Sequence, residues 1–265
     1  MANESQILYT NVAADATMTV TNEETGYEKE YLVDSLVSVP YRSTGITEIK
    51  ITFDFGAAKT VQGVTVHKHN VESGDTTYKW ESSNNNFTDT IETQNLTLLT
   101  RTVKELNANN VLTDVTRRDA YYFDEWDERY YRVRIQKASG SYIEMGEICI
   151  WTGNYTCDKN FSIGYSMGKE TIFSNVNGSN GQVFRRFKNS RVIGDFPFEN
   201  LDDTQKELFD ETIGLNEHIC FFDHMRTQLF FGGLKFGIPV NIRTTDSGTP
   251  AETWNMQGAF TEHIG

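Results

Sequence analysis

Apolar and polar residues alternate along most of the first half of the chain, and a period of two predicts β-strands with one buried face. Polar loops such as 71–75, 82–90 and 107–111 separate the alternating segments. Many short strands at this spacing predict an antiparallel sandwich or jelly roll. The segments predicted as strands are 16–21, 46–55, 60–69, 76–82, 127–138 and 142–153.

Two of these segments predict finer detail. In 60–69 the alternation slips at Gly63, and a slip of one residue at a glycine predicts a β-bulge. In 127–138 one face is apolar and should meet the core. The residues of that face are Tyr131, Val133 and Ile135.

The character of the chain changes after Gly153, where residues 154–160 are typical of a linker. The predicted domains are therefore a sandwich over 1–153 and a second domain over 161–265. Strand-like segments rich in Phe and Gly dominate the second domain.

One short helix interrupts the second domain, near residues 202–213. Asp202 can cap its first turn, with Gln205 three residues later as the capping-box partner. The predicted fold class is thus mainly β: an N-terminal antiparallel β-sandwich (jelly roll) plus a C-terminal β-rich domain with one short helix.

The composition limits the classes of partner that this chain is expected to bind. The 265 residues carry a formal net charge of −13, which would repel nucleic acid and anionic lipid, so neither is expected as a partner. The N-terminus lacks the basic start and apolar run of a signal peptide, and none is expected. The three cysteines have no metal-type spacing and predict reduced, partly buried thiols.

Several motifs follow one another in a fixed order. They are "LVDSLVSVPYRSTG" (32–45), "ITFDFGAAKTVQGVTVHKH" (51–69), "YKWESSNNNFTD" (78–89) and "RYYRVRIQKASGSYIEMGEICIWTG" (129–153). In this order they resemble the discoidin, or coagulation factor 5/8 type C, group of galactose-binding-like jelly rolls. The resemblance implies a fold that serves sugar binding, phospholipid binding or structural roles in assemblies, with ligands held by loops at one end.

The resemblance also bears on cofactors. Several members of the group hold a structural calcium near the first loop, where Asp34 would be the first ligand in this chain. Tyr41 stands where the family has a tryptophan before the basic residue. No other cofactor is expected.

The predicted ligand end combines aromatic rings, which stack on sugars, with Arg and Asn side chains, which bond hydroxyls. The same residue types dominate protein–protein contacts, so a glycan and a neighbouring subunit both remain open as its ligand. The candidate residues are Tyr41, Arg42, Trp80, Asn84 and Asn85.

Other motifs favour structural interpretations. His67 and His69 are two apart on a predicted strand, which suits a shared metal, but a solvated strand face is the more common explanation. His218, Asp223 and His224 lack the context of a catalytic dyad. No catalytic or metal-binding residue is therefore predicted, and the chain is not expected to be an enzyme.

The second domain resembles, in layout, domains of bacteriophage tail and virion proteins, through "FENL", a capped helix, "ICFFDH" and "LFFGG". This implies a structural virion component, made in the host cytoplasm, that binds copies of itself and other virion proteins. The alternative is a carbohydrate-binding module that recognises host surface glycans. The predicted interface residues are Arg185, Arg186, Arg191, Phe221, Phe222, Phe230 and Phe231.

Overall fold

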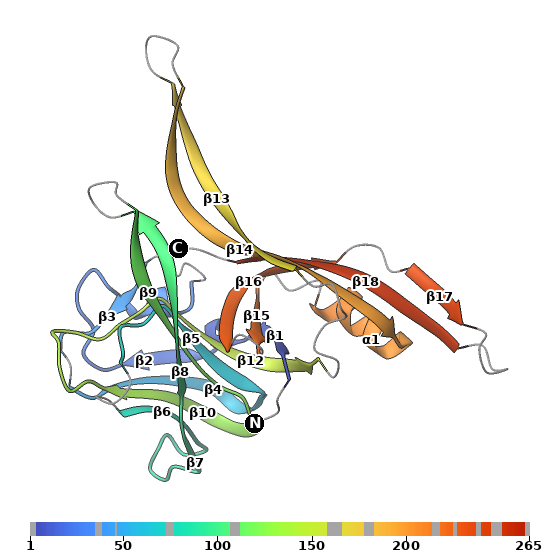
Figure 1. Cartoon of the computed structure of the whole chain (residues 1–265). Helices are drawn as coiled ribbons and strands as arrows, with labels where there is room; N and C mark the ends of the chain where they lie inside the picture. Colours follow the sequence, from blue (N-terminus) through green and yellow to red (C-terminus); the bar gives the residue numbers. More distant parts are fainter. Residues whose placement is uncertain are drawn as a thin grey trace.

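The protein is described here from a computed structural model (Figure 1). The described residues are 4–34, 39–45, 47–72, 77–106, 112–157, 166–177, 183–213, 218–224, 227–236, 240–244 and 251–262. Within these ranges the chain is mainly β, as predicted, and no helix is long and apolar enough to cross a membrane.

One layer of the N-terminal part is a five-stranded antiparallel sheet with the order β2-β4-β10-β6-β7. Its strands are β2 (Thr17–Val20), β4 (Ile49–Val61), β10 (Trp126–Gln136), β6 (Thr77–Ser83) and β7 (Glu92–Asn95).

The facing layer is half of an eleven-stranded sheet, whose strands on this side follow the order β1-β12-β5-β9-β8. They are β1 (Gln6–Asn11), β12 (Glu147–Thr156), β5 (Gly63–His67), β9 (Leu112–Tyr122) and β8 (Thr97–Leu106). Two short 3₁₀ turns, η1 (Ala13–Asp15) and η2 (Lys29–Leu32), lie in the connections.

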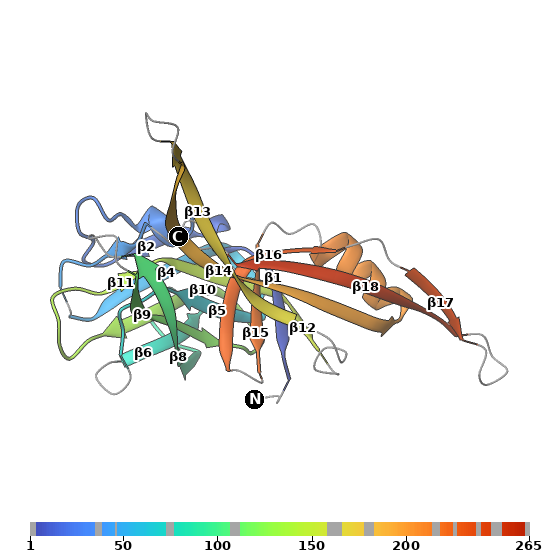
Figure 2. The same ribbon diagram turned by 45° about the horizontal axis from the view of Figure 1, so that its top comes forward.

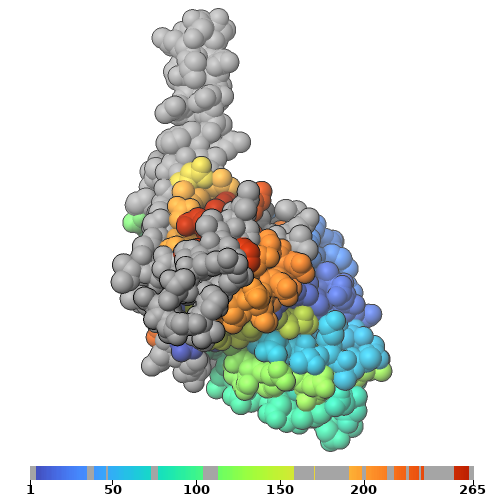
Figure 3. Space-filling view, turned by 90° about the vertical axis from the view of Figure 1, so that its right-hand side faces the viewer, coloured from blue at the N-terminus to red at the C-terminus, as the bar shows by residue number. Residues whose placement is uncertain are grey.

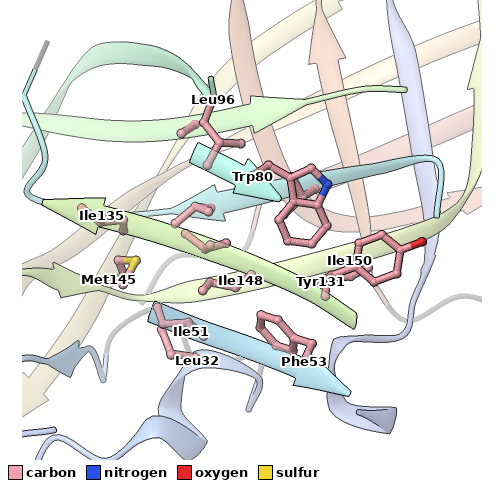
Figure 4. Packing of buried hydrophobic residues seen from close by; sticks show 14 of the residues in the cluster. Leu32, Ile51, Phe53, Trp80, Leu96, Tyr131, Ile135, Met145, Ile148 and Ile150 are labelled. Atoms are coloured by element: carbon pink, nitrogen blue, oxygen red, sulfur yellow. The ribbon is translucent and has the colours of Figure 1, made fainter. Parts of the chain in front are cut away.

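The core lies between these two layers, as Figure 4 shows. Tyr131, Val133 and Ile135 on β10 are fully buried there, so the predicted apolar face is confirmed. The alternation has this effect because successive side chains of a strand point to opposite faces of the sheet.

The predicted bulge at Gly63 is wrong. β4 ends at Val61 in the five-stranded sheet, and β5 begins at Gly63 in the other, so the slip marks the residue where the chain changes layers. A Cβ at Gly63 would lie 3.0 Å from the carbonyl oxygen of Tyr122, which explains the glycine at this close approach.

The second part continues the eleven-stranded sheet. β1 pairs with β12 on one edge and with β15 on the other, so the N-terminal strand joins the two parts. The order continues as β15-β16-β18-β14-β13, and β17 pairs with β18. These strands are β13 (Ser166–Asn177), β14 (Val183–Leu201), β15 (Ile219–Asp223), β16 (Gln228–Phe236), β17 (Val240–Thr244) and β18 (Ala251–Glu262).

The proposed linker begins within a strand, because residues 154–156 belong to β12 and pair with β1. Cys157 follows and is buried, as are Cys149 and Cys220, and none of the three is in a disulfide. Residues 158–160 lie outside the described ranges.

The predicted helix is present. α1 (Asp203–Glu207) continues as a π-helical turn, η3 (Leu208–Ile213). Asp202 accepts a hydrogen bond from the backbone of Gln205, whose side chain accepts one in return, so the capping box is confirmed. Phe209 of the turn is buried against Tyr155 of β12, and the orange surface of this region in Figure 3 is continuous with that of the N-terminal part.

Candidate functional site

A very short antiparallel pair carries the residues predicted for the ligand end. β3 (Tyr41–Arg42) pairs with β11 (Glu144–Met145), so that Arg42 lies opposite Glu144 and Tyr41 opposite Met145. Tyr41 and Met145 are fully buried, whereas Arg42 and Glu144 face outward. The prediction that Tyr41 offers a ring to a ligand is therefore contradicted, because strand alternation directs that ring into the core.

Arg42 lies instead between two other tyrosines. Its guanidinium carbon is 4.0 Å from the ring centre of Tyr27 and 4.1 Å from that of Tyr142. Its Nε and Nη2 donate to Oε2 of Glu144 at 3.3 and 2.8 Å. We call Tyr27, Arg42, Tyr142 and Glu144 the Arg42 platform.

Backbone hydrogen bonds hold the Tyr27 loop beside β3. The amide of Arg42 donates to the carbonyl of Tyr27 at 3.3 Å, and the amide of Glu24 donates to the carbonyl of Arg42 at 3.0 Å. Between Glu24 and Tyr27 the chain turns at Gly26, whose φ of +90° favours glycine. These hydrogen bonds therefore fix the position of the Tyr27 loop beside Arg42.

On the other side of the platform, Asn70 holds the segment that carries Tyr142 and leads into β11. Its side-chain amide donates to the carbonyl of Tyr142 at 3.1 Å, and its side-chain oxygen accepts from the amide of Glu144 at 3.0 Å. Both donor and acceptor of Asn70 are thus used in positioning, and we assign it no direct ligand contact.

The platform is electrostatically balanced. The hydrogen bond to Glu144 raises the pKa of the Arg42 guanidinium, and the side chains of this ion pair are 22% and 23% exposed. A guanidinium has five N–H donors, and two of them meet Glu144. The remaining N–H donors, the Glu144 carboxylate and the partly exposed rings of Tyr27 and Tyr142 are groups that a polyhydroxylated ligand can contact.

The other predicted ligand residues do not join this site. Trp80 is 1% exposed and stacks in the core on Tyr131, with ring centres 5.3 Å apart, so the prediction that it contacts a ligand is also contradicted. Tyr78 and Ser82 on the same face of β6 are also buried, and so are Glu81 and Ser83 on the opposite face.

Asn84 and Asn85 are exposed, but at the opposite end of the sandwich. Ser83 pairs with Tyr130 near the start of β10, whereas β3 lies beyond the other end of that strand. The side chain of Asn84 accepts from the amide of Arg129 at 3.0 Å. The sequence predicted that these residues share one ligand end. In the structure, Arg42 lies at one end of the sandwich, and Asn84 and Asn85 lie at the other.

The Asn84 end has its own arginine–tyrosine arrangement. Arg129 donates to both oxygens of Asp54 at 2.7 and 2.8 Å, and its guanidinium lies 4.7 Å from the ring centre of Tyr130. Only one ring contacts this arginine in the described structure, so no enclosed platform forms. This end serves below as a matched control.

The predicted interface residues divide into two groups. Phe221, Phe222, Phe230 and Phe231 are buried within the sheet layers, so they are core residues of this chain and are not available to a partner. Arg191 pairs with Glu170 at 2.6 Å near the surface. Arg185 and Arg186 are on β14, opposite Asn175 and Ser174 of β13.

His67 and His69 are both buried, so the interpretation as a solvated strand face is wrong. Nδ1 of His67 lies 3.6 Å from Oδ1 of Asp119, and its Nε2 lies 3.0 Å from the hydroxyl of Thr65. Burial alone would raise the pKa of Asp119, but His67 and Arg117 hold it well below its usual range. Within the described ranges, no group of three or more His, Cys, Asp or Glu could hold a metal ion.

His69 makes the folded chain sensitive to acid. Burial lowers its pKa from 6.5 to about 4, so the unfolded chain binds a proton more readily than the folded chain between these values. The contribution of His69 to the free energy of unfolding is therefore fully present above pH 6.5. It falls by about 3 kcal/mol as the pH decreases towards 4. Burial also lowers the pKa of His67, which acts in the same direction.

We expect His69→Asn to flatten this dependence. The asparagine oxygen can replace Nδ1, which accepts from the amide of Val71 at 3.2 Å, and it does not titrate. Urea unfolding between pH 7 and pH 4 measures the difference. An equally steep decline in the variant would contradict the assignment to His69.

The N-terminal part of this chain is similar to a number of solved structures, of which three are described here. A chitosan-binding module of a chitosanase/glucanase from Paenibacillus sp. IK-5 is 18% identical, over 54% of this chain and 99% of the module, with a TM-score of 0.38. The lectin domain of lectinolysin, complexed with Lewis B antigen, is 13% identical over 54% and 97%, with a TM-score of 0.39. A carbohydrate-binding module from Clostridium perfringens, in complex with GalNAc-β-1,3-galactose, is 12% identical over 54% and 99%, with a TM-score of 0.37.

No protein-family model and no curated protein sequence matches this chain. A likeness at these identities concerns the fold, and it does not transfer the ligands of those proteins to this chain. The antiparallel sandwich predicted for the N-terminal part is confirmed by its two facing sheets, and the solved structures that this part is similar to are carbohydrate-binding and lectin modules. The likeness of the second part to phage virion proteins remains a prediction.

Sequence reasoning missed Tyr27 and Tyr142. Tyr142 shares the outward face with Glu144, two residues later, so alternation around the buried Ile143 was a usable sign. Tyr27 reaches Arg42 only through hydrogen bonds between distant segments, which no local pattern reveals.

Proposed function

We propose that the N-terminal sandwich is a non-catalytic module that binds a surface glycan at the Arg42 platform. The observation that carries the proposal is the enclosed stack of Tyr27, Arg42 and Tyr142, closed by the Glu144 carboxylate. It supports the alternative function stated from the sequence, with two new aromatic residues in place of Tyr41 and Trp80.

The chemistry of the platform favours a neutral sugar. Aromatic faces stack on the C–H face of a pyranose, while guanidinium donors and carboxylate oxygens bond its hydroxyls. Glu144 neutralises Arg42, and the whole chain carries −13, so an acidic glycan would gain little and meet long-range repulsion.

The test is binding of the full chain to an array of neutral glycans, followed by calorimetry on the best ligand. Tyr142→Ala and Arg42→Ala are expected to weaken binding by about tenfold or more, because each removes part of one stack. The matched controls Tyr130→Ala and Arg129→Ala remove the same residue types at the Asn84 end and should leave binding unchanged.

Two results would overturn the proposal. One is the absence of saturable binding to any neutral glycan by the folded chain. The other is a glycan whose affinity falls in the Arg129 and Tyr130 variants and not in the Arg42 platform variants, which would move the site to the Asn84 end.

A second candidate function is that of a structural subunit of a phage-type virion, as the sequence suggested. The observation that favours it is a long two-stranded extension of the sheet, formed by β13 and β14, which stands away from the body in Figures 1 and 2. Extensions of this kind offer surface to neighbouring subunits in an assembly. Light scattering after size exclusion, over a wide range of concentration, tests for self-assembly.

A further inference from the structure

The Arg42 guanidinium is covered by two rings and remains open along one edge. The ring centres of Tyr27 and Tyr142 lie 4.0 and 4.1 Å from its carbon atom, so the faces of the group are taken. Nε and Nη2 both donate to Oε2 of Glu144, which occupies the side edge of the group. A ligand therefore meets Arg42 along the end edge, which Nη1 and the second hydrogen of Nη2 form.

This end edge presents two parallel N–H bonds. Nη1 of Arg42 donates to no residue that the structure describes, and the side chains of the ion pair with Glu144 are partly exposed. Two parallel donors match two acceptor oxygens held side by side. A carboxylate, a phosphate and two hydroxyl groups on neighbouring carbons all meet this requirement, so the guanidinium alone does not choose among them.

The Glu144 carboxylate decides between these ligands. Its Oε2 accepts both hydrogen bonds from Arg42, whereas its Oε1 accepts none from the described part of the chain. An open acceptor beside the guanidinium needs a donor and repels an anion. An ionised carboxylate or phosphate offers acceptors only, but a vicinal diol offers acceptor oxygens for Arg42 and an O–H donor for Glu144.

The Asn84 end shows the contrasting arrangement. Arg129 donates from Nε to Oδ1 of Asp54 at 2.7 Å and from Nη2 to Oδ2 at 2.8 Å. The amide of Gly56 also donates to Oδ1, at 2.8 Å. Both oxygens of Asp54 are thus engaged within the chain, and this carboxylate lacks the open oxygen that Glu144 has.

We propose that the Arg42 platform recognises a vicinal diol of a neutral sugar. One hydroxyl oxygen accepts from Nη1 of Arg42, its neighbour accepts from Nη2, and one of the two hydroxyls donates to Oε1 of Glu144. The proposal rests on the glycan-binding function proposed above and names the group that is recognised. Glu144 is then the residue that selects neutral over anionic sugars, since two parallel guanidinium donors by themselves suit a carboxylate.

Methyl pyranosides test the recognition of a diol. The full chain is titrated by NMR with methyl α-glucoside, methyl α-mannoside and methyl α-galactoside, and then with each monodeoxy derivative of the one that binds best. Loss of either hydroxyl of one vicinal pair should weaken binding by about tenfold or more, because a hydrogen bond to a charged group is lost. Loss of a hydroxyl outside the pair should change the affinity by less than about threefold.

Glu144→Gln tests the selection by charge. The amide oxygen can still accept from Arg42, but the side chain no longer repels an anion. The affinity for the methyl uronoside of the same configuration, divided by that for the neutral glycoside, should rise by about fivefold or more. Asp54→Asn removes the matched carboxylate at the Asn84 end and should leave this ratio unchanged. A ratio measured within one variant does not depend on the fraction of the chain that is folded.

The outcomes separate this inference from the function on which it rests. Equal affinities for all the monodeoxy derivatives would overturn the diol and leave glycan binding in place. Binding of a glycan on the array that none of the three methyl pyranosides reproduces would do the same. An unchanged ratio in Glu144→Gln would overturn the selection by charge. Absence of binding to every neutral glycan would overturn both the inference and the proposed function.

Discussion

Trp80→Ala is expected to lower the free energy of unfolding by about 3–5 kcal/mol, the range for removing a large aromatic side chain from a packed core. Trp80 is 1% exposed and lies between Tyr131 and Trp126, with ring centres 5.3 and 6.1 Å away and nearly parallel planes. Its loss leaves a cavity between the two layers that the surrounding strands cannot close. Urea unfolding followed by circular dichroism measures the effect, since fluorescence would change with the tryptophan itself.

The control is Phe87→Ala, on the turn that follows β6. The ring centre of Phe87 lies 3.8 Å from the guanidinium carbon of Arg132, and the Phe87 side chain is only partly buried. Its loss should cost about 1 kcal/mol or less, as for an exposed cation–π contact. Equal losses in the two variants would show that Trp80 is not a core residue and would reopen its assignment as a ligand contact.

Glu262→Ala is expected to cost about 3–5 kcal/mol, because it leaves two buried guanidinium groups without their main counter-charge. Oε1 of Glu262 accepts from Nη2 of Arg101 and lies 3.8 Å from Nη1 of Arg117. Its Oε2 accepts from the amide of Val192 at 3.0 Å. The side chains of Arg101 and Arg117 are 9% and 8% exposed, and among the described residues the other carboxylate paired with them is that of Asp119, at 3.8 and 3.9 Å.

This cluster also joins the two parts of the chain, since β18 supplies Glu262 and the β8–β9 hairpin supplies both arginines. The control is Glu170→Ala, which breaks the partly exposed pair with Arg191 and should cost less than about 1 kcal/mol. The same unfolding measurement compares them. A Glu262→Ala variant as stable as Glu170→Ala would show that the two buried arginines find other partners.

Local patterns predicted the elements of this fold well. Alternation identified β2, β4, β5, β6, β10 and β12, since burial of one face is required along a half-buried strand, but it did not identify β1, β7, β8 and β9. The capping box at Asp202 and Gln205 identified the helix start, because its hydrogen bonds join residues only three apart.

The candidate site was predicted only in part. Arg42 was identified and does face outward, but Tyr41 and Trp80 are core residues, and Asn84 and Asn85 lie at the other end of the sandwich. An aromatic residue at a strand end or in a short strand fits a core and a ligand surface equally well. Only the packing of the second layer decides between them.

By itself, then, the sequence determined the fold class, the inner face of β10, the helix cap and the charge that disfavours polyanions, because these depend on neighbouring residues or on a sum over the chain. The tertiary structure decided which loops share an end, that Tyr27 and Tyr142 enclose Arg42, and that β1 joins the two parts into one sheet. It also decided that Gly63 marks a change of layer. These features depend on hydrogen bonds and packing between segments far apart in the chain, whose pairing no local pattern specifies.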